Sequence, residues 1–134
     1  MSYQVFLVED HPAMCQAYAQ ILEREADLDL CGMAGTAEEF LDRLHDTPCD
    51  LVLTDLSLPG MDGYALVERV RSERPDLPVI IVSAHQDVGH EARARDAGAR
   101  AYLTKDHIAR HLGSAIRRAI EEAPEAPGGG AAPA

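Results

Sequence analysis

The chain has 134 residues, 46% of them hydrophobic and 26% charged, which suits one folded domain and excludes a largely disordered chain. The formal net charge of -11 argues against direct nucleic-acid binding, because a chain that neutralises phosphates needs an excess of basic residues. No apolar run approaches the ~20 residues needed to cross a bilayer, so we expect no membrane association.

Five short apolar runs alternate with longer segments of helical period along the chain. The runs are rich in Val, Ile and Leu and nearly continuous, which is typical of strands buried on both faces of a parallel sheet. The predicted strands are Val5–Val8, Leu28–Ala34, Leu51–Thr54, Val79–Val82 and Ala101–Leu103.

The segments between these runs carry helix start and stop signals. Pro12 stands in a first turn, Thr36 and Glu39 form a capping-box pattern, Asp62 can act as an N-cap, and Gly98 suits a helix C-terminus. The predicted helices are Pro12–Glu25, Ala37–His45, Gly63–Arg74, Val88–Ala97 and Ile108–Glu122. Five successive strand–helix units predict an α/β fold with helices on both faces of a five-stranded parallel sheet.

The composition changes after Glu122 to a segment of Ala, Pro and Gly with one Glu. Such a segment cannot bury enough apolar surface to order itself. We therefore expect a folded domain over residues 1–123 and a flexible tail or truncated linker over residues 124–134.

Three cysteines, Cys15, Cys31 and Cys49, are odd in number and lack C-x-x-C spacing. We expect neither a disulfide framework nor a zinc site, and we interpret the three as reduced, mostly buried thiols. The N-terminal residues include no basic leader, so we also expect no signal peptide. These features together predict a cytoplasmic protein.

Polar side chains stand where the predicted strands end. Glu9 and Asp10 follow the first strand, Asp55 the third and Ser83 the fourth, and the fifth strand runs into Lys105. Ligands of parallel α/β sheets bind beyond the carboxyl ends of the strands, so this is where a site is expected. Three carboxylates in one cleft repel one another unless a cation lies among them, and their oxygen atoms suit Mg²⁺.

A phosphoryl-transfer chemistry follows from this set of side chains. Asp55 can attack a phosphoryl group as a nucleophile, while a metal ion, Lys105 and the Ser83 hydroxyl stabilise charge on the phosphoryl oxygens. Each residue alone has an ordinary structural interpretation; Glu9 and Asp10, for example, could simply cap the helix that begins at Pro12. The joint placement at four strand ends indicates the site.

Four motifs resemble the receiver domains of bacterial two-component response regulators over about residues 3–122. They are the acidic-pair motif Phe6–His11, the phosphoacceptor loop Asp55–Gly63, the switch-hydroxyl strand Ile81–Ala84 and the segment Gly98–Lys105. The details Glu9–Pro12 and Lys105–Asp106 are most similar to the NarL/LuxR-type subgroup. The resemblance implies a flavodoxin-like fold with strand order 2-1-3-4-5.

The resemblance also implies residue roles at the metal site. Asp55 would be the phosphorylation site, supplied by a sensor histidine kinase. Asp10 and Asp55 would bind Mg²⁺ (or Mn²⁺) directly, Glu9 would act largely through water, and the backbone carbonyl of Ser57 would supply another ligand. The protein would then be a signalling phosphoacceptor rather than an enzyme, promoting its own Mg²⁺-dependent phosphorylation and dephosphorylation.

The remaining implied roles concern the response to phosphorylation. Lys105 would pair with the phosphoryl group, Ser83 and Tyr102 would be the coupled switch residues, and Ala84 would leave the phosphoryl group room. Partners, including a second copy of the chain in a homodimer, would read the change. Members of the subgroup usually carry a helix-turn-helix output domain that regulates transcription, so we expect either a receiver that works alone or a fragment cut in a linker.

Asp106 stands where many receivers have a proline joined by a cis bond. A cis bond without proline costs ~2.5–4 kcal/mol, so we predict a trans Lys105–Asp106 bond. Among the histidines, only His107 and His111 have metal-ligand spacing, and we expect no metal site there.

Two other functions fit an α/β sheet of this kind. A haloacid-dehalogenase-type phosphatase or phosphotransferase also uses an Asp nucleophile with Mg²⁺, but it needs a second Asp two residues later, where this chain has Ser57. A flavin-binding electron carrier needs a phosphate loop rich in Ser, Thr and Gly after the first strand, where Glu9 and Asp10 would repel a phosphate.

Overall fold

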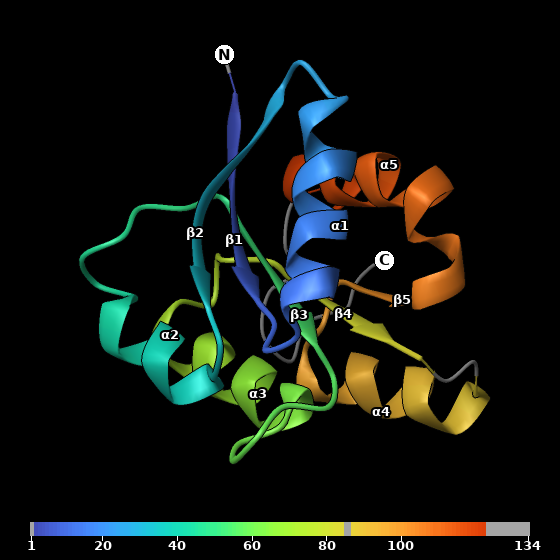
Figure 1. Ribbon diagram of the computed structural model, residues 1–134. Helices are drawn as coiled ribbons and strands as arrows, with labels where there is room; N and C mark the ends of the chain where they lie inside the picture. The colour runs from blue at the N-terminus through green and yellow to red at the C-terminus, as the bar shows by residue number, and fades with distance from the viewer. Residues whose placement is uncertain (1, 85–86, 123–134) are drawn as a thin grey trace.

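One parallel sheet organises the computed structural model, which describes residues 2–84 and 87–122 (Figure 1). The five strands lie in the order β2-β1-β3-β4-β5, as the resemblance implied, and all pairs are parallel. The strands are β1 Tyr3–Val8, β2 Leu28–Ala34, β3 Leu51–Asp55, β4 Val79–Ser83 and β5 Ala101–Thr104.

The five predicted helices all form, with ends that differ from the prediction by up to two residues. They are α1 Pro12–Glu23, α2 Ala37–Arg43, α3 Gly63–Glu73, α4 Val88–Ala97 and α5 Ile108–Glu121. A short 3₁₀ helix, η1 Lys105–His107, precedes α5 and was not predicted.

Side-chain caps begin α2 and α3 where the sequence patterns placed them. The Thr36 hydroxyl accepts a hydrogen bond from the Glu39 backbone N–H at 3.0 Å, and the Asp62 carboxylate accepts one from Ala65 at 2.9 Å. The Glu39 carboxylate accepts a hydrogen bond from the Gly35 N–H at 3.0 Å. In a standard capping box it would accept one from the N-cap residue, which here is Thr36.

Helices cover both faces of the sheet, and each face has its own apolar core. In Figure 1, α1 and α5 lie on one face, whereas α2, α3 and α4 lie on the other. Successive residues of β1 point to opposite faces, so Val5 and Leu7 pack with α1 and α5, while Phe6 and Val8 pack with α2 and α3. Because all the strands are parallel, their carboxyl ends lie together at one edge of the sheet.

The central strands agree with the expectation of burial on both faces, and the edge strands do not. Every residue of β3 and β4 is buried, but β2 includes half-buried and exposed residues and β5 includes half-buried ones. The reason is positional, because an edge strand has a sheet neighbour on one side only.

The cysteines are less buried than the sequence suggested. Cys15, Cys31 and Cys49 are all free thiols, as expected, but each is half-buried. They contact the apolar cores without being enclosed by them, because Cys15 lies on α1, Cys31 on the edge strand β2 and Cys49 in the loop before β3, none of them on a central strand.

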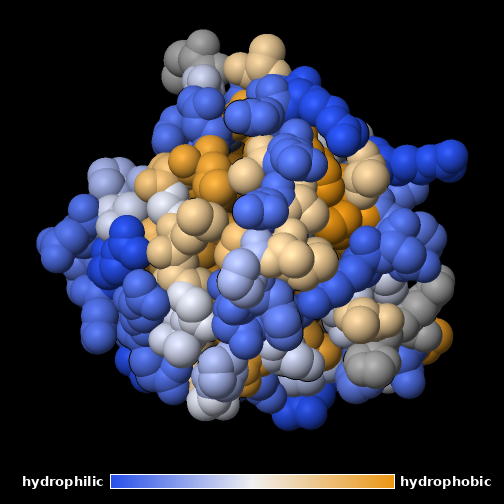
Figure 2. Space-filling view, in the orientation of Figure 1, coloured by the Kyte–Doolittle hydropathy of each residue, from blue (hydrophilic) through white to orange (hydrophobic). Residues whose placement is uncertain are grey.

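Hydrophilic side chains dominate the face seen in Figure 2, with hydrophobic residues gathered over β2 and beside α1. Within residues 2–84 and 87–122, no helix has the length and apolar character needed to cross a bilayer. The predicted tail, residues 124–134, lies outside the described residues.

Candidate functional site

The predicted site residues meet at the carboxyl edge of the sheet. Asp55 is the last residue of β3 and Ser83 the last of β4, while Glu9 and Asp10 follow β1 directly. Lys105 follows β5 as the first residue of η1. The parallel register that pairs Asp55 with Val82 brings the ends of β3 and β4 level with each other.

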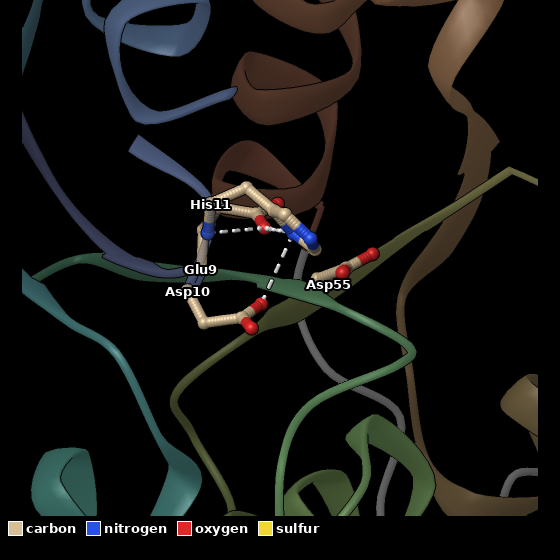
Figure 3. A group of neighbouring side chains, drawn as sticks. All are labelled: Glu9, Asp10, His11 and Asp55. Atoms are coloured by element: carbon tan, nitrogen blue, oxygen red, sulfur yellow. Dashed lines mark hydrogen bonds and ion pairs between the residues drawn. The ribbon is translucent and has the colours of Figure 1, made fainter. Parts of the chain in front are cut away.

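Four side chains form a compact group at this edge (Figure 3). One potential ligand atom from each of Glu9, Asp10, His11 and Asp55 lies within 4.8 Å of all the others. Glu9 and Asp55 are buried, with 2% and 3% of their surface exposed, whereas Asp10 and His11 are exposed. The group therefore combines two buried carboxylates with two side chains that solvent can reach.

Lys105 supplies the ammonium that the sequence analysis anticipated. Its Nζ lies 3.4 Å from Asp55 Oδ1 and 4.0 Å from Glu9 Oε1. Burial, and then the negative charge of Glu9, nevertheless raise the pKa of Asp55 above its ordinary value, although Lys105 acts in the opposite direction. One ammonium thus leaves the buried carboxylates incompletely compensated.

Glu9 carries the clearest sign of a cation site. Its Oε2 accepts one hydrogen bond from the His11 backbone N–H and also contacts His11 Nδ1, both at 3.2 Å. Its Oε1 is buried and has no hydrogen-bond partner among the described residues. An ionised oxygen without a partner is costly to bury, and a divalent cation with oxygen ligands would offset that cost. The donor set therefore fits Mg²⁺.

The loop after Asp55 folds tightly onto the start of α3. The Gly63 N–H donates to the Leu56 carbonyl at 2.9 Å, and a Cβ at Gly63 would lie 2.8 Å from the Asp55 carbonyl oxygen. Only glycine permits this approach, which keeps the loop beside the site. Ser57 is exposed in this loop, and the role of its carbonyl as a ligand stays a prediction.

The two predicted switch residues occupy neighbouring strands. Ser83 is buried, and Tyr102 on β5 is half-buried against the core shared by α3 and α4. Ala84 is exposed beside the site. Their positions fit the predicted coupling, which stays a prediction.

The turn after β5 agrees with the predicted trans geometry, since the described residues contain no cis peptide bond. Thr104 Oγ1 and His107 Nδ1 are hydrogen-bonded at 2.9 Å across η1. This contact spans the short 3₁₀ turn that begins at Lys105.

His11 is the site residue that sequence reasoning missed, because it has no second histidine at ligand spacing. Its place directly after the acidic pair was the available signal. His107 and His111 instead meet edge to face, with ring centroids 5.9 Å apart, and are not in the metal-capable group found among the described residues.

The response regulator receiver domain family matches residues 5–117 of this chain. The chain belongs to that family. The haloacid-dehalogenase-type alternative gains no support from this match, which covers most of the chain.

Two curated relatives extend well beyond the matched region of this receiver domain. This chain is 27% identical over 118 residues to the response regulator protein VraR of Staphylococcus saprophyticus, and the match covers 88% of this chain and 56% of the relative. It is 32% identical over 103 residues to the uncharacterized transcriptional regulatory protein YhcZ of Bacillus subtilis, covering 77% of this chain and 48% of the relative. The chain therefore spans about half the length of the curated relatives it matches.

Solved structures support the same fold and subgroup. A LuxR-family two-component response regulator from Aurantimonas sp. SI85-9A1 is 27% identical, with a TM-score of 0.87, covering 92% of this receiver domain and 89% of that chain. A CheY-like receiver domain from Methanospirillum hungatei is 29% identical, with a TM-score of 0.78, covering 90% and 95%. The predicted fold and NarL/LuxR-type resemblance are confirmed.

Proposed function

We propose that Asp55 of this receiver domain accepts a phosphoryl group from a sensor histidine kinase and that the modification switches its contacts with partners. The observation that carries the proposal is a buried carboxylate at the end of the central strand, with the Lys105 ammonium 3.4 Å from it inside an acidic group. A carboxylate with a purely structural role would not need an ammonium and further carboxylates around it.

The transfer is a displacement at phosphorus. An Asp55 carboxylate oxygen forms the new bond to phosphorus, the bond to the donor histidine nitrogen breaks, and that nitrogen keeps the electron pair. Lys105 pairs with the phosphoryl oxygens. Asp10, Asp55 and the Ser57 carbonyl would hold Mg²⁺, with Glu9 acting through water, and the ion would neutralise charge on those oxygens. The same residues promote the later hydrolysis.

The response rests on Ser83 and Tyr102. A phosphoryl group on Asp55 brings negative charge and strong acceptor oxygens, and the Ser83 hydroxyl donates a hydrogen bond to them. Movement of Ser83 vacates space beside α4, and the half-buried Tyr102 ring turns inward to fill it. The surface of α4, β5 and α5 then differs between the two states, and a partner that prefers one state reads the difference.

The proposed setting is a cytoplasmic two-component system. The names of the two relatives, a response regulator and a transcriptional regulatory protein, support a role in regulating transcription. With its net charge of -11, we expect this chain to act on transcription through partners or an output domain and not by binding DNA itself. The domain extends over residues 1–123, with residues 124–134 as a tail or linker.

Labelling with acetyl phosphate, a small phosphoryl donor, tests the proposed function. We expect a phosphoryl adduct on the peptide that contains Asp55 when Mg²⁺ is present, and none in excess chelator or in Asp55→Asn. Asp50→Asn is the matched control, because Asp50 is an exposed carboxylate at the opposite end of β3. Labelling that persists in chelator or in Asp55→Asn would overturn the proposal.

A further inference from the structure

We propose that the His11 imidazole is a direct ligand of the ion at this site, so that the receiver domain binds nitrogen-preferring divalent ions, such as Co²⁺, Ni²⁺ and Zn²⁺, more tightly than Mg²⁺. The inference deepens the proposed function, because it uses the same acidic group, but it makes a separate claim about the ligand set and the choice of metal.

The spacing of the His11 ring from the carboxylates is the first observation. Nδ1 lies 3.2 Å from Glu9 Oε2 and 3.2 Å from Asp10 Oδ1. Two ligand atoms at right angles around a first-row divalent ion, each about 2.1 Å from it, lie about 3.0 Å apart. The His11 nitrogen and the Asp10 oxygen are therefore already spaced as neighbouring ligands would be, with the Glu9 carboxylate beside them to hold an ion-bound water.

The unpartnered oxygen of Glu9 is a second and independent observation. The Glu9 side chain has no exposed surface, and its Oε1 accepts no hydrogen bond from the described residues. The nearest ammonium, on Lys105, is 4.0 Å from that oxygen. A buried acceptor without a partner, on one of four neighbouring potential ligands, indicates a cation site rather than a chance cluster of surface charges.

Local structure holds the imidazole in position. His11 is the N-cap residue of α1, with an extended backbone, and its side chain makes no cap hydrogen bond. Pro12 restricts the backbone that follows, and the His11 N–H is bound to Glu9. The ring is directed over the carboxylates instead (Figure 3). Because 65% of the side chain is exposed, positions around an ion would stay open to water or a phosphoryl oxygen.

The choice of metal follows from the donor atom. Mg²⁺ prefers oxygen ligands, so an added nitrogen contributes little to its binding. Imidazole nitrogen suits later first-row ions, whose affinity for such sites rises toward Ni²⁺ and Cu²⁺. A receiver site with carboxylates alone would show a smaller difference in affinity between Mg²⁺ and the later first-row ions.

Calorimetric titration of the full chain with CoCl₂ and with MgCl₂ tests this proposal. We expect His11→Asn to weaken Co²⁺ binding by about tenfold to a hundredfold and Mg²⁺ binding by less than about threefold. The Co²⁺ complex of the parent protein should also show paramagnetically shifted imidazole resonances that are missing in the variant. Retained Mg²⁺ binding shows that the variant site is folded.

His45→Asn is the matched control, because His45 is 72% exposed and contacts Glu73 rather than the acidic group. The double variant His107→Gln/His111→Gln removes the other histidine pair, and it should bind Co²⁺ as the parent does. Equal Co²⁺ affinity in His11→Asn and the parent, or loss of Co²⁺ binding only in the double variant, would overturn the proposal. Mg²⁺-dependent labelling of Asp55 in the parent protein separately decides the proposed function.

Discussion

At the scale of single residues, Asp55 is held in an environment that disfavours its own charge. Its pKa is raised by burial and by Glu9, so the folded state binds its proton more tightly than the unfolded state does. Its contribution to stability is therefore greatest below the ordinary carboxyl pKa and is lost as the pH rises through the folded value. At neutral pH and without a metal, the ionised carboxylate destabilises the fold.

We therefore predict that Asp55→Asn raises the free energy of unfolding by on the order of 1 kcal/mol at pH 7 in chelator. The gain should shrink as the pH falls below about 4, where both proteins are neutral at this position. Urea denaturation at several pH values measures it. Asp50→Asn should show no such gain, since Asp50 is exposed and accepts a hydrogen bond from the Gln4 N–H. A destabilised Asp55→Asn would contradict this account.

Cys49 offers a second test at this scale. Burial raises the pKa of its thiol to about 11, so roughly one molecule in a thousand carries the thiolate at pH 8, against about one in four for an ordinary cysteine. The thiolate is the reactive form. We predict that the rate of Cys49 alkylation rises about tenfold per pH unit between pH 8 and pH 10.

Peptide-resolved mass spectrometry after timed iodoacetamide treatment measures that rate, with a short cysteine peptide as the control. The control rate should level off as the pH passes its ordinary pKa. A Cys49 rate that levels off at the same pH would show that the protein does not shift this thiol.

At the scale of elements, the end of α4 depends on one backbone conformation. Gly98 has a φ of 119°, which side-chain-bearing residues rarely adopt, and its N–H closes the helix by donating to the Ala94 and Arg95 carbonyls. A Cβ there would also lie 2.7 Å from Arg71 Cδ. The turn leads directly into β5, which carries Tyr102 and is followed by Lys105.

We predict that Gly98→Ala lowers the free energy of unfolding by about 1–2 kcal/mol. Gly35→Ala is the matched control, because an added Cβ meets nothing within 4 Å there and the backbone φ is not positive. The control should change stability by no more than about 0.5 kcal/mol. Thermal and urea denaturation compare the two, and equal effects would show that the Gly98 backbone is not the determinant.

At the scale of the whole molecule, the proposed switch links the acidic edge of the sheet to the surface of α4, β5 and α5. Ser83 and Tyr102 lie between the two, on adjacent strands paired in register. Phosphorylation shifts the equilibrium between the two states only by as much as it stabilises one state more than the other. A difference of a few kcal/mol suffices when the states are close in energy.

We predict that acetyl phosphate with Mg²⁺ raises the fraction of homodimer in sedimentation experiments, and that Ser83→Ala is labelled but dimerises less. Removal of the hydroxyl leaves Asp55 intact while it deletes the donor that senses the phosphoryl group. Asp55→Asn should keep the homodimer fraction of the unphosphorylated protein. An equal shift in Ser83→Ala and the parent would rule out this coupling while leaving Asp55 as the site.

The amino-acid sequence by itself was enough to predict the elements, because the signals for them are local. Apolar runs and helical periods located every strand and α-helix that the described residues form, and short-range capping by Thr36 and Asp62 formed where predicted. It was also enough to place Glu9, Asp10 and Asp55 at one edge, since parallel strands bring their carboxyl ends together. The strand order came from the family resemblance and not from these patterns.

Only the tertiary structure decided how far apart the site atoms lie and which of them lack partners. The distances from Lys105 to Asp55 and to Glu9 depend on sheet register, because the three residues stand at the ends of different strands, and no local pattern encodes them. The unpartnered oxygen of Glu9 likewise exists because the fold removes it from water without supplying a donor. The incomplete burial of β2 and β5 was decided in the same way, because a strand lies at the edge of a sheet only once its neighbours are placed.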